Sequence, residues 1–248
     1  MTGLLTALQF LTAIPISAKH SEDKDMARSI VYFPIVGLSI GLIAALCAKT
    51  MMALDINEFA INGLLVVILI IITGGLHLDG LADTFDALVS GKTRDEMLNI
   101  MRDPHIGTMG VLALASTLLL KFSFLFCVEA QAKGAVLVLM CVLSRWSMVA
   151  AMAAFPYARK EGKARLFFEG TDRIKLILAT LFTVAIAAAI FGMRGIVIFA
   201  AVAIAAYIFG RIVSRKIGGM TGDTLGAMSE LTEIVALFGI CALKGVLP

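Results

Sequence analysis

Long apolar blocks, each close to the length that crosses a lipid bilayer, dominate this sequence. A transmembrane helix needs about 20 consecutive apolar residues, and it satisfies its own backbone hydrogen bonds inside the hydrocarbon. We identify seven candidate spans, at residues 31–53, 59–78, 108–128, 134–155, 174–193, 195–210 and 230–247. The sequence therefore predicts an all-α polytopic membrane protein with about seven transmembrane helices.

The composition excludes a soluble globular protein. Hydrophobic residues make up 60% of the 248 residues and charged residues only 16%, whereas a soluble domain carries about 25% charge. The connections between the spans are at most about 30 residues long, too short for an independent core. We therefore expect a single integral membrane domain that covers residues 1–248.

Residues 1–16 are apolar but short, and they end next to Pro15. We expect an N-terminal interfacial or re-entrant helix here. A cleaved signal peptide does not fit, because no Lys or Arg precedes Lys19 and the positive region of such a peptide is missing.

Basic residues alternate between the connections. One set of alternate connections contains 15 Lys and Arg residues and the other contains four. Because basic residues accumulate on the cytoplasmic side of a membrane protein, this bias predicts a cytoplasmic N-terminus. It also places the two main acidic stretches on the cytoplasmic face.

The first acidic stretch contains three aspartates at helical spacing. Asp79, Asp83 and Asp86 occur at i, i+4 and i+7, so a helix brings them to one face. A solvated helix start would also favour acidic residues, but leucines and Phe85 flank these and indicate a helix at or in the membrane. Carboxylates there are costly and functional by default, and hard oxygen ligands suit Mg²⁺, Mn²⁺ or Ca²⁺.

The second acidic stretch lies at residues 217–233. Asp223 and Glu230 again share a helix face, and nearby glycines allow the backbone to approach a ligand closely. A flexible loop leading into a helix is the alternative interpretation. We expect Asp223 and Glu230 to bind metal, Thr221 and Gly222 to bind substrate, and this stretch to share one acidic cavity with Asp79.

Three further charged positions complete the candidate site. Arg102 and His105 flank Pro104 in a turn, where both could hold a phosphate, while Asp103 could bind metal or orient Arg102. Arg145 lies inside a predicted span and needs an anionic partner there. That partner could be one of the clustered carboxylates or a substrate phosphate.

Together these residues indicate phosphoryl-group chemistry at a membrane surface. Clustered carboxylates would hold a divalent metal that neutralises a diphosphate, and basic residues would hold the phosphates. The sequence has no G-x-x-x-x-G-K-[ST] loop, so a P-loop enzyme is excluded.

Three segments form a specific pattern: GGLHLDGLADTFDAL (74–88), RDEMLNIMRDPHIGTMG (94–110) and IGGMTGDTLGAMSELTE (217–233). They resemble the cobalamin synthase family, the adenosylcobinamide-GDP ribazoletransferases of the late vitamin B12 pathway. The resemblance implies that α-ribazole, or its 5′-phosphate, attacks adenosylcobinamide-GDP and that GMP leaves. It also implies Mg²⁺ dependence, a bacterial cytoplasmic membrane location and an active site that faces the cytoplasm.

The expected catalytic residues are Asp79, Asp83 and His77, and the expected metal ligands include Asp86 and Asp103. The expected partners are the two substrates and membrane lipid, without nucleic acid; a homo-oligomer is compatible with the sequence.

A CDP-alcohol phosphotransferase is the alternative enzyme. This sequence departs from the motif of that family, because Leu76 stands where the motif has its first aspartate and Asp83-Thr84 stand where it has Ala-Arg. A secondary transporter is the alternative from another class, although its site would lie nearer the midplane.

Overall fold

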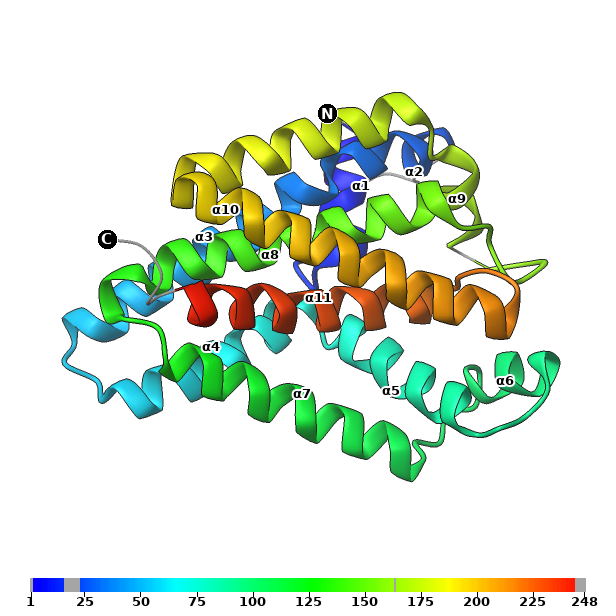
Figure 1. Ribbon diagram of the computed structural model, residues 1–248, viewed down its shortest axis with the longest axis horizontal. Coiled ribbons are helices and arrows are strands. Elements are labelled where there is room, and N and C mark those ends of the chain that lie inside the picture. Colours follow the sequence, from blue (N-terminus) through cyan, green and yellow to red (C-terminus); the bar gives the residue numbers. More distant parts are fainter. Residues whose placement is uncertain (1, 16–22, 163, 244–248) are drawn as a thin grey trace.

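The computed structural model describes residues 2–15, 23–162 and 164–243, and these form a bundle of helices (Figure 1). Over these ranges the predicted all-α fold is confirmed, since the regular structure is helical apart from one isolated β-bridge between Tyr157 and Met220. The elements are α1 (Thr2–Leu11), α2 (Asp23–Ser29), η1 (Ile30–Tyr32), α3 (Phe33–Ala53), α4 (Glu58–Thr73), α5 (Leu76–Val89), α6 (Arg94–Ile100), α7 (Thr108–Phe126), η2 (Ala130–Ala132), α8 (Lys133–Ala154), α9 (Arg165–Gly170), α10 (Arg173–Ile217) and α11 (Gly222–Ala242).

The apolar helices make this a multi-pass membrane protein. Five helical segments among the described residues are long and apolar enough to cross a membrane, and a sixth is reached if α4 and α5 count together as one broken span. In this count α10 is one helix. The number of seven spans therefore stays a prediction, whereas the helical membrane fold is shown.

The second predicted span, residues 59–78, is wrong as a straight helix. α4 ends at Thr73, and α5 continues at 91° to it. Gly74 and Gly75 lie between the two helices with φ of 62° and 71°, and this left-handed conformation suits glycine because it has no Cβ. The break turns α5, with its aspartates, across the end of the bundle.

Helix α10 contains two predicted spans, residues 174–193 and 195–210, and doubles back between them (Figure 1). Gly192 has non-helical backbone angles, φ 56° and ψ −134°. A Cβ added to Gly195 would lie 2.0 Å from Ala187 O. Eight residues of straight helix would separate these positions by about 12 Å, so the two limbs fold against each other. The second limb continues to Ile217, beyond the predicted end.

Helix α8 forms the centre of the bundle and is buried along almost its whole length. Added Cβ atoms at Gly37 and Gly41 of α3 would lie 2.4 Å from Cys141 O and 2.5 Å from Val138 Cα. These two glycines form a G-x-x-x-G pattern, which lets helix backbones approach closely in membranes. α8 also packs against α10 and α11, so its polar residues face protein rather than lipid.

The helices at the two ends of the chain differ in how well the sequence predicts them. α1 spans Thr2–Leu11, which confirms a short N-terminal helix of about 15 Å; residues 1 and 16 of the predicted segment lie outside the described residues. α11 begins at Gly222, well before the predicted span 230–247, of which residues 244–247 lie outside the described residues. Asp223 therefore opens this helix, and Glu230 lies deeper in the bundle.

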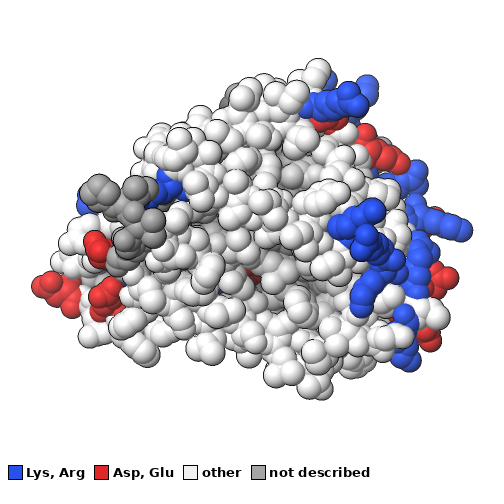
Figure 2. Space-filling view, viewed as in Figure 1, with Lys and Arg blue, Asp and Glu red and all other residues white. Residues whose placement is uncertain are grey.

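The face of the molecule in Figure 2 has two charged ends separated by a broad band that carries almost no charge. Lys and Arg side chains gather at the right-hand end, where Figure 1 shows α2, α6, α9 and the turn between α10 and α11. Large apolar side chains such as Leu46, Leu119 and Leu181 are more than 60% exposed, which fits a lipid-facing surface.

Candidate active site

Helices α5 and α11 touch through two glycines. A Cβ added to Gly80 would lie 2.9 Å from Asp223 Cα, and one added to Gly226 would lie 3.1 Å from His77 Cα. Since neighbouring Cα atoms are about 3.8 Å apart, the Asp79 and Asp223 Cα atoms lie within about 8 Å of each other. The structure thus brings the two acidic stretches together at Asp79 and Asp223, as the sequence predicts.

A cavity of about 300 Å³ opens beside this contact. Three parts of the chain supply its polar lining. They are α5 with His77 and Asp79, the start of α11 with Gly222 and Asp223, and the segment after α8 with Tyr157 and Arg159.

Asp83 lies one turn after Asp79 on α5 and is half-buried. The carboxylates that act on it electrostatically are Asp79, Asp86 and Asp223, and the cation is Arg159. This end of α5 therefore concentrates negative charge at one place, a setting that favours a bound cation.

The donor set fits a Mg²⁺ ion that is bound together with a phosphate ligand. Within the described residues, no three His, Cys, Asp or Glu side chains are arranged to hold a metal on their own. Mg²⁺, however, is commonly held by one or two carboxylates with substrate phosphates and water. Asp79 and Asp223 offer such a pair of oxygen donors from two helices that touch.

Asp86 has a different position from the one predicted for a metal ligand. Its Oδ2 accepts the Gly107 N–H at 2.7 Å, and its Oδ1 accepts the Gly110 N–H at 2.8 Å. Both oxygens thus serve the unsatisfied N–H groups at the start of α7. A Cβ at Gly107 or Gly110 would lie 2.4 Å from this carboxylate, which explains both glycines. The geometry favours a structural role for Asp86.

The charges of Glu230 and Arg145 are already balanced by neighbouring side chains. Lys121 Nζ contacts Glu230 Oε2 and Glu233 Oε2, each at 2.6 Å, and Arg145 Nη1 pairs with Glu233 Oε1. All four side chains are almost fully buried. Two cations and two carboxylates thus compensate each other inside the membrane region, a neutral arrangement in which buried charge is tolerated. Neither Glu230 as a metal ligand nor Arg145 as a phosphate ligand is favoured by these contacts.

His77 connects this buried charge cluster to the cavity. Its Nδ1 lies 3.4 Å from Arg145 Nη2, and because a guanidinium only donates hydrogen bonds, Nδ1 acts as the acceptor. Its Nε2 then carries the hydrogen, and it is buried without a hydrogen-bond partner.

In the turn before α7, two of the three predicted site residues, Asp103 and His105, pair with each other. Asp103 accepts hydrogen bonds from the His105 backbone N–H at 3.0 Å and from His105 Nδ1 at 2.6 Å. These bonds hold the pKa of Asp103 below its usual range, and both side chains are exposed. Asp103 therefore orients His105 and not Arg102.

Arg102 lines a second hollow of about 380 Å³, together with Arg94, Arg159 and Lys160. Asp95 and Glu161 also line it, but four basic side chains against two acidic ones leave an excess of positive charge, which suits phosphate groups. Arg159 also lines the acidic cavity, so the basic hollow and the acidic cavity adjoin each other there.

Arg159 is the site residue that the sequence did not single out. Its Nη2 contacts Asp223 Oδ2 at 2.7 Å, and its side chain is only 13% exposed. In the sequence it is one of six basic residues in a single connection that is predicted to be cytoplasmic, and nothing in their spacing distinguishes it. Arg159 differs from the other five only because the folded connection brings it against Asp223 of α11.

The backbone around Arg159 is fixed by its neighbours. Ala158 N donates to Met220 O at 2.8 Å, and Met220 N donates to Pro156 O at 2.8 Å. Arg94 spans the same junction, because its Nη2 donates to Ala158 O at 2.7 Å and its Nε donates to Ile217 O at 2.8 Å. One guanidinium thus ties α6, the Arg159 segment and the end of α10 together.

Thr221 caps α11 and supports the cavity indirectly. Its Oγ1 accepts the Thr224 N–H at 3.2 Å and lies 3.3 Å from Asp223 Oδ2. The side chain is fully buried, so Thr221 orients Asp223. Gly222, the other predicted substrate residue here, does line the cavity.

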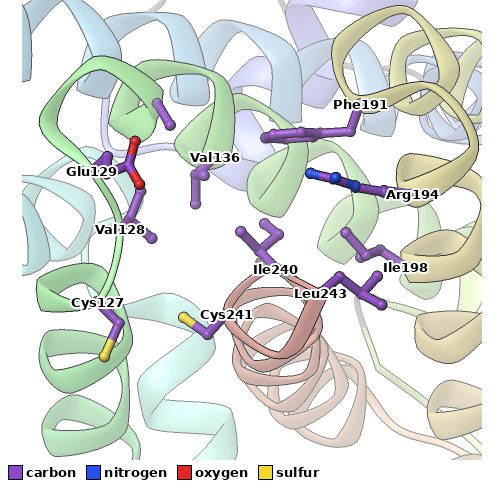
Figure 3. A pocket seen from close by; sticks show the side chains of 11 residues that line it. Cys127, Val128, Glu129, Val136, Phe191, Arg194, Ile198, Ile240, Cys241 and Leu243 are labelled. Atoms are coloured by element: carbon purple, nitrogen blue, oxygen red, sulfur yellow. The ribbon is translucent and has the colours of Figure 1, made fainter. Parts of the chain in front are cut away.

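A separate cavity of about 240 Å³ lies at the opposite end of the bundle. Figure 3 shows Glu129 and Arg194 on opposite sides of it, above an apolar wall that includes Ile198 and Ile240. None of the predicted site residues lines this cavity. The predicted site residues therefore all lie away from this cavity.

Comparison with known proteins gives a consistent result over nearly the whole chain. The family described as cobalamin-5-phosphate synthase matches residues 3–241. Three similar proteins, each named adenosylcobinamide-GDP ribazoletransferase, come from Desulforamulus reducens, Geotalea daltonii and Escherichia coli K12. The first is 38% identical over 237 residues, covering 96% of this chain and 95% of the relative. The second is 37% identical over 240 residues, covering 96% of each chain, and the third is 37% identical over 240 residues, covering 94% and 96%. No solved structure matches the chain.

Proposed function

This chain belongs to the cobalamin-5-phosphate synthase family, and we propose that it acts as an adenosylcobinamide-GDP ribazoletransferase in a membrane. The observation that carries the proposal is the cavity between α5 and α11. It lies where two of the segments that resemble the family, residues 74–88 and 217–233, meet. The substrate class then follows from the names of the relatives, which are similar over almost their full length.

The reaction replaces one phosphate substituent by another. A hydroxyl oxygen of α-ribazole, or of its 5′-phosphate, forms a bond to the cobinamide-linked phosphorus of adenosylcobinamide-GDP. The bond from that phosphorus to the bridging oxygen breaks, and GMP leaves with this oxygen. The hydroxyl proton passes to a basic group in or beside the cavity, for which Asp79 and Asp83 are our candidates.

The cavity residues divide into acidic and basic groups. Asp79 and Asp223 would hold a Mg²⁺ ion together with the diphosphate, and the ion would neutralise charge on the diphosphate and on the leaving GMP. Asp83, one turn further along α5, would add negative charge beside this ion. Arg102, on the basic hollow, would hold phosphate oxygens. His77 lines the same cavity, and its unpaired Nε2–H would donate a hydrogen bond to a substrate oxygen.

The orientation follows from the charge distribution. Basic side chains surround the end of the bundle that carries the cavity (Figure 2), and such residues accumulate on the cytoplasmic side. We therefore place the site at the cytoplasmic face of the bacterial inner membrane, where nucleotide substrates are present.

The test is release of GMP from adenosylcobinamide-GDP by the purified protein in detergent, with α-ribazole and with or without Mg²⁺. We expect equimolar GMP and adenosylcobalamin, and no release after chelation. Detergent removes any sealed compartment, so a transporter would form no product. Absence of GMP release from a folded preparation would reject the proposed function.

A further inference from the structure

We propose that Arg159 is a diphosphate-binding residue that Asp223 holds in place until substrate arrives. Binding of the diphosphate would exchange the Arg159–Asp223 ion pair for an Arg159–phosphate contact, and Asp223 would become free to face the cation. The inference rests on the proposed function, because it concerns the diphosphate of that substrate.

The position of Arg159 is the first observation that carries this inference. Its side chain lines both the acidic cavity and the basic hollow that contains Arg94 and Arg102. A diphosphate whose metal lies near Asp79 would extend from the acidic cavity towards this basic hollow. Arg159 stands at the junction between the two.

The hydrogen bonding of Arg159 is the second observation. Its Nη2 contacts Asp223 at 2.7 Å, while its Nε is buried and has no hydrogen-bond partner. A guanidinium presents its N–H groups as a planar fork that matches two oxygens of one phosphate. The buried Nε is therefore an unused donor beside the cavity, and a phosphate could satisfy it together with a neighbouring N–H.

The contrast with Arg145 shows why this pair can exchange. The side chains of Arg145 and Glu233 are 1% and 3% exposed, and Glu233 also pairs with Lys121. Separating Arg145 from Glu233 would therefore leave uncompensated charges buried in the membrane. Arg159 and Asp223 are 13% and 25% exposed. Their ion pair is reachable by solvent and substrate, and an incoming phosphate and cation would replace both partners at once.

The experiment measures GDP binding in the presence of a chelator, which isolates the contribution of arginine from that of metal. For Arg159→Gln we expect GDP affinity to fall about 10- to 100-fold, the range for loss of a hydrogen bond to a charged group. For Asp223→Asn we expect GDP affinity to rise about 3- to 10-fold, because Arg159 no longer has a competing partner. Arg215→Gln, an exposed arginine near the end of α10, should leave GDP affinity unchanged.

Two further variants separate ion-pair exchange from simple charge neutralisation. Asp79→Asn removes a carboxylate of the same cavity that is not paired with Arg159, so it should raise GDP affinity less than Asp223→Asn does. The double variant Arg159→Gln/Asp223→Asn should still bind GDP well below wild-type affinity, and should exceed Arg159→Gln by no more than the gain that Asp79→Asn gives. If Arg159 only neutralised Asp223, the double variant would instead recover wild-type affinity, and the inference would be wrong.

Failure of this inference is distinguishable from failure of the proposed function. Wild-type protein that releases no GMP from adenosylcobinamide-GDP rejects the function, whatever the behaviour of Arg159. Wild-type protein that turns over, combined with an Arg159→Gln variant that binds GDP normally, rejects the role of Arg159 alone. Thermal unfolding of each variant confirms that the comparison is made between folded proteins.

Discussion

Glu233 is the residue on which the buried charge cluster depends, because it accepts from both Lys121 and Arg145. Glu233→Gln would leave these two cations with Glu230 as their one carboxylate in the cluster. Breaking a buried ion pair by removing one partner costs about 3–5 kcal/mol. We therefore expect a large fall in Tm and a low yield of folded protein, which thermal unfolding in detergent measures.

Glu169→Gln is the matched control for this prediction. Glu169 pairs with Arg165 at 2.6 Å, but both side chains are about half exposed. An exposed ion pair contributes less than about 1 kcal/mol, so the Tm should change little. Equal losses of Tm in the two variants would contradict a structural role for the buried cluster.

These residues also show what the sequence can specify at this scale. Spacing along one helix predicts that Asp79 and Asp83 share a face, and burial predicts that Arg145 needs an anionic partner. Which partner Arg145 takes depends on which helices pack together, and no local pattern reports that. Arg159 was missed for the same reason, because its ion pair with Asp223 joins positions far apart in the chain.

At the scale of elements, the contact between α5 and α11 determines the site, and Gly80 permits it. A Cβ at Gly80 would lie 2.6 Å from Asp223 O and 2.9 Å from Asp223 Cα, both backbone atoms. Gly80→Ala must therefore push the helices apart, and we expect GMP release to fall at least tenfold, with a loss of about 1–3 kcal/mol of stability. Steady-state GMP release together with thermal unfolding checks this.

Gly75→Ala separates this steric effect from backbone strain. Gly75 has φ of 71°, but a Cβ there would meet no atom within 4 Å. The substitution should cost about 1–2 kcal/mol for the left-handed conformation and should leave turnover largely intact. A greater loss of turnover in Gly75→Ala than in Gly80→Ala would show that helix contact is not what limits the site.

The helix boundaries explain which elements the sequence could predict. Apolar length identifies the membrane helices, but hydropathy does not register a bend inside an apolar run. The break at Gly74 and Gly75 and the reversal at Gly192 depend on backbone angles, so the straight span 59–78 was wrong. α11 was predicted to start too late because residues 222–229, which include Asp223 and two glycines, are less apolar than the stretch that follows them.

At the scale of the whole molecule, the charged ends predict orientation. In a Cys127→Ser background, Lys160→Cys lies on the basic hollow, and Gln131→Cys lies in η2 at the opposite end of the bundle. We expect a membrane-impermeant maleimide to label Gln131→Cys in intact cells, and to label Lys160→Cys only after the cytoplasmic side is opened. Labelling of Lys160→Cys from outside would reverse the proposed topology.

The central claim is that α5 and α11 share one cation site. This site would bind metal together with the substrate diphosphate. The direct measurement is the affinity for Mn²⁺, a spectroscopic substitute for Mg²⁺, by electron paramagnetic resonance with GDP bound. We expect Asp79→Asn and Asp223→Asn each to weaken Mn²⁺ binding at least tenfold, since each removes one of very few carboxylate ligands. Wild-type Mn²⁺ affinity in Asp223→Asn, with loss of affinity only in Asp79→Asn, would contradict a site shared between the two helices.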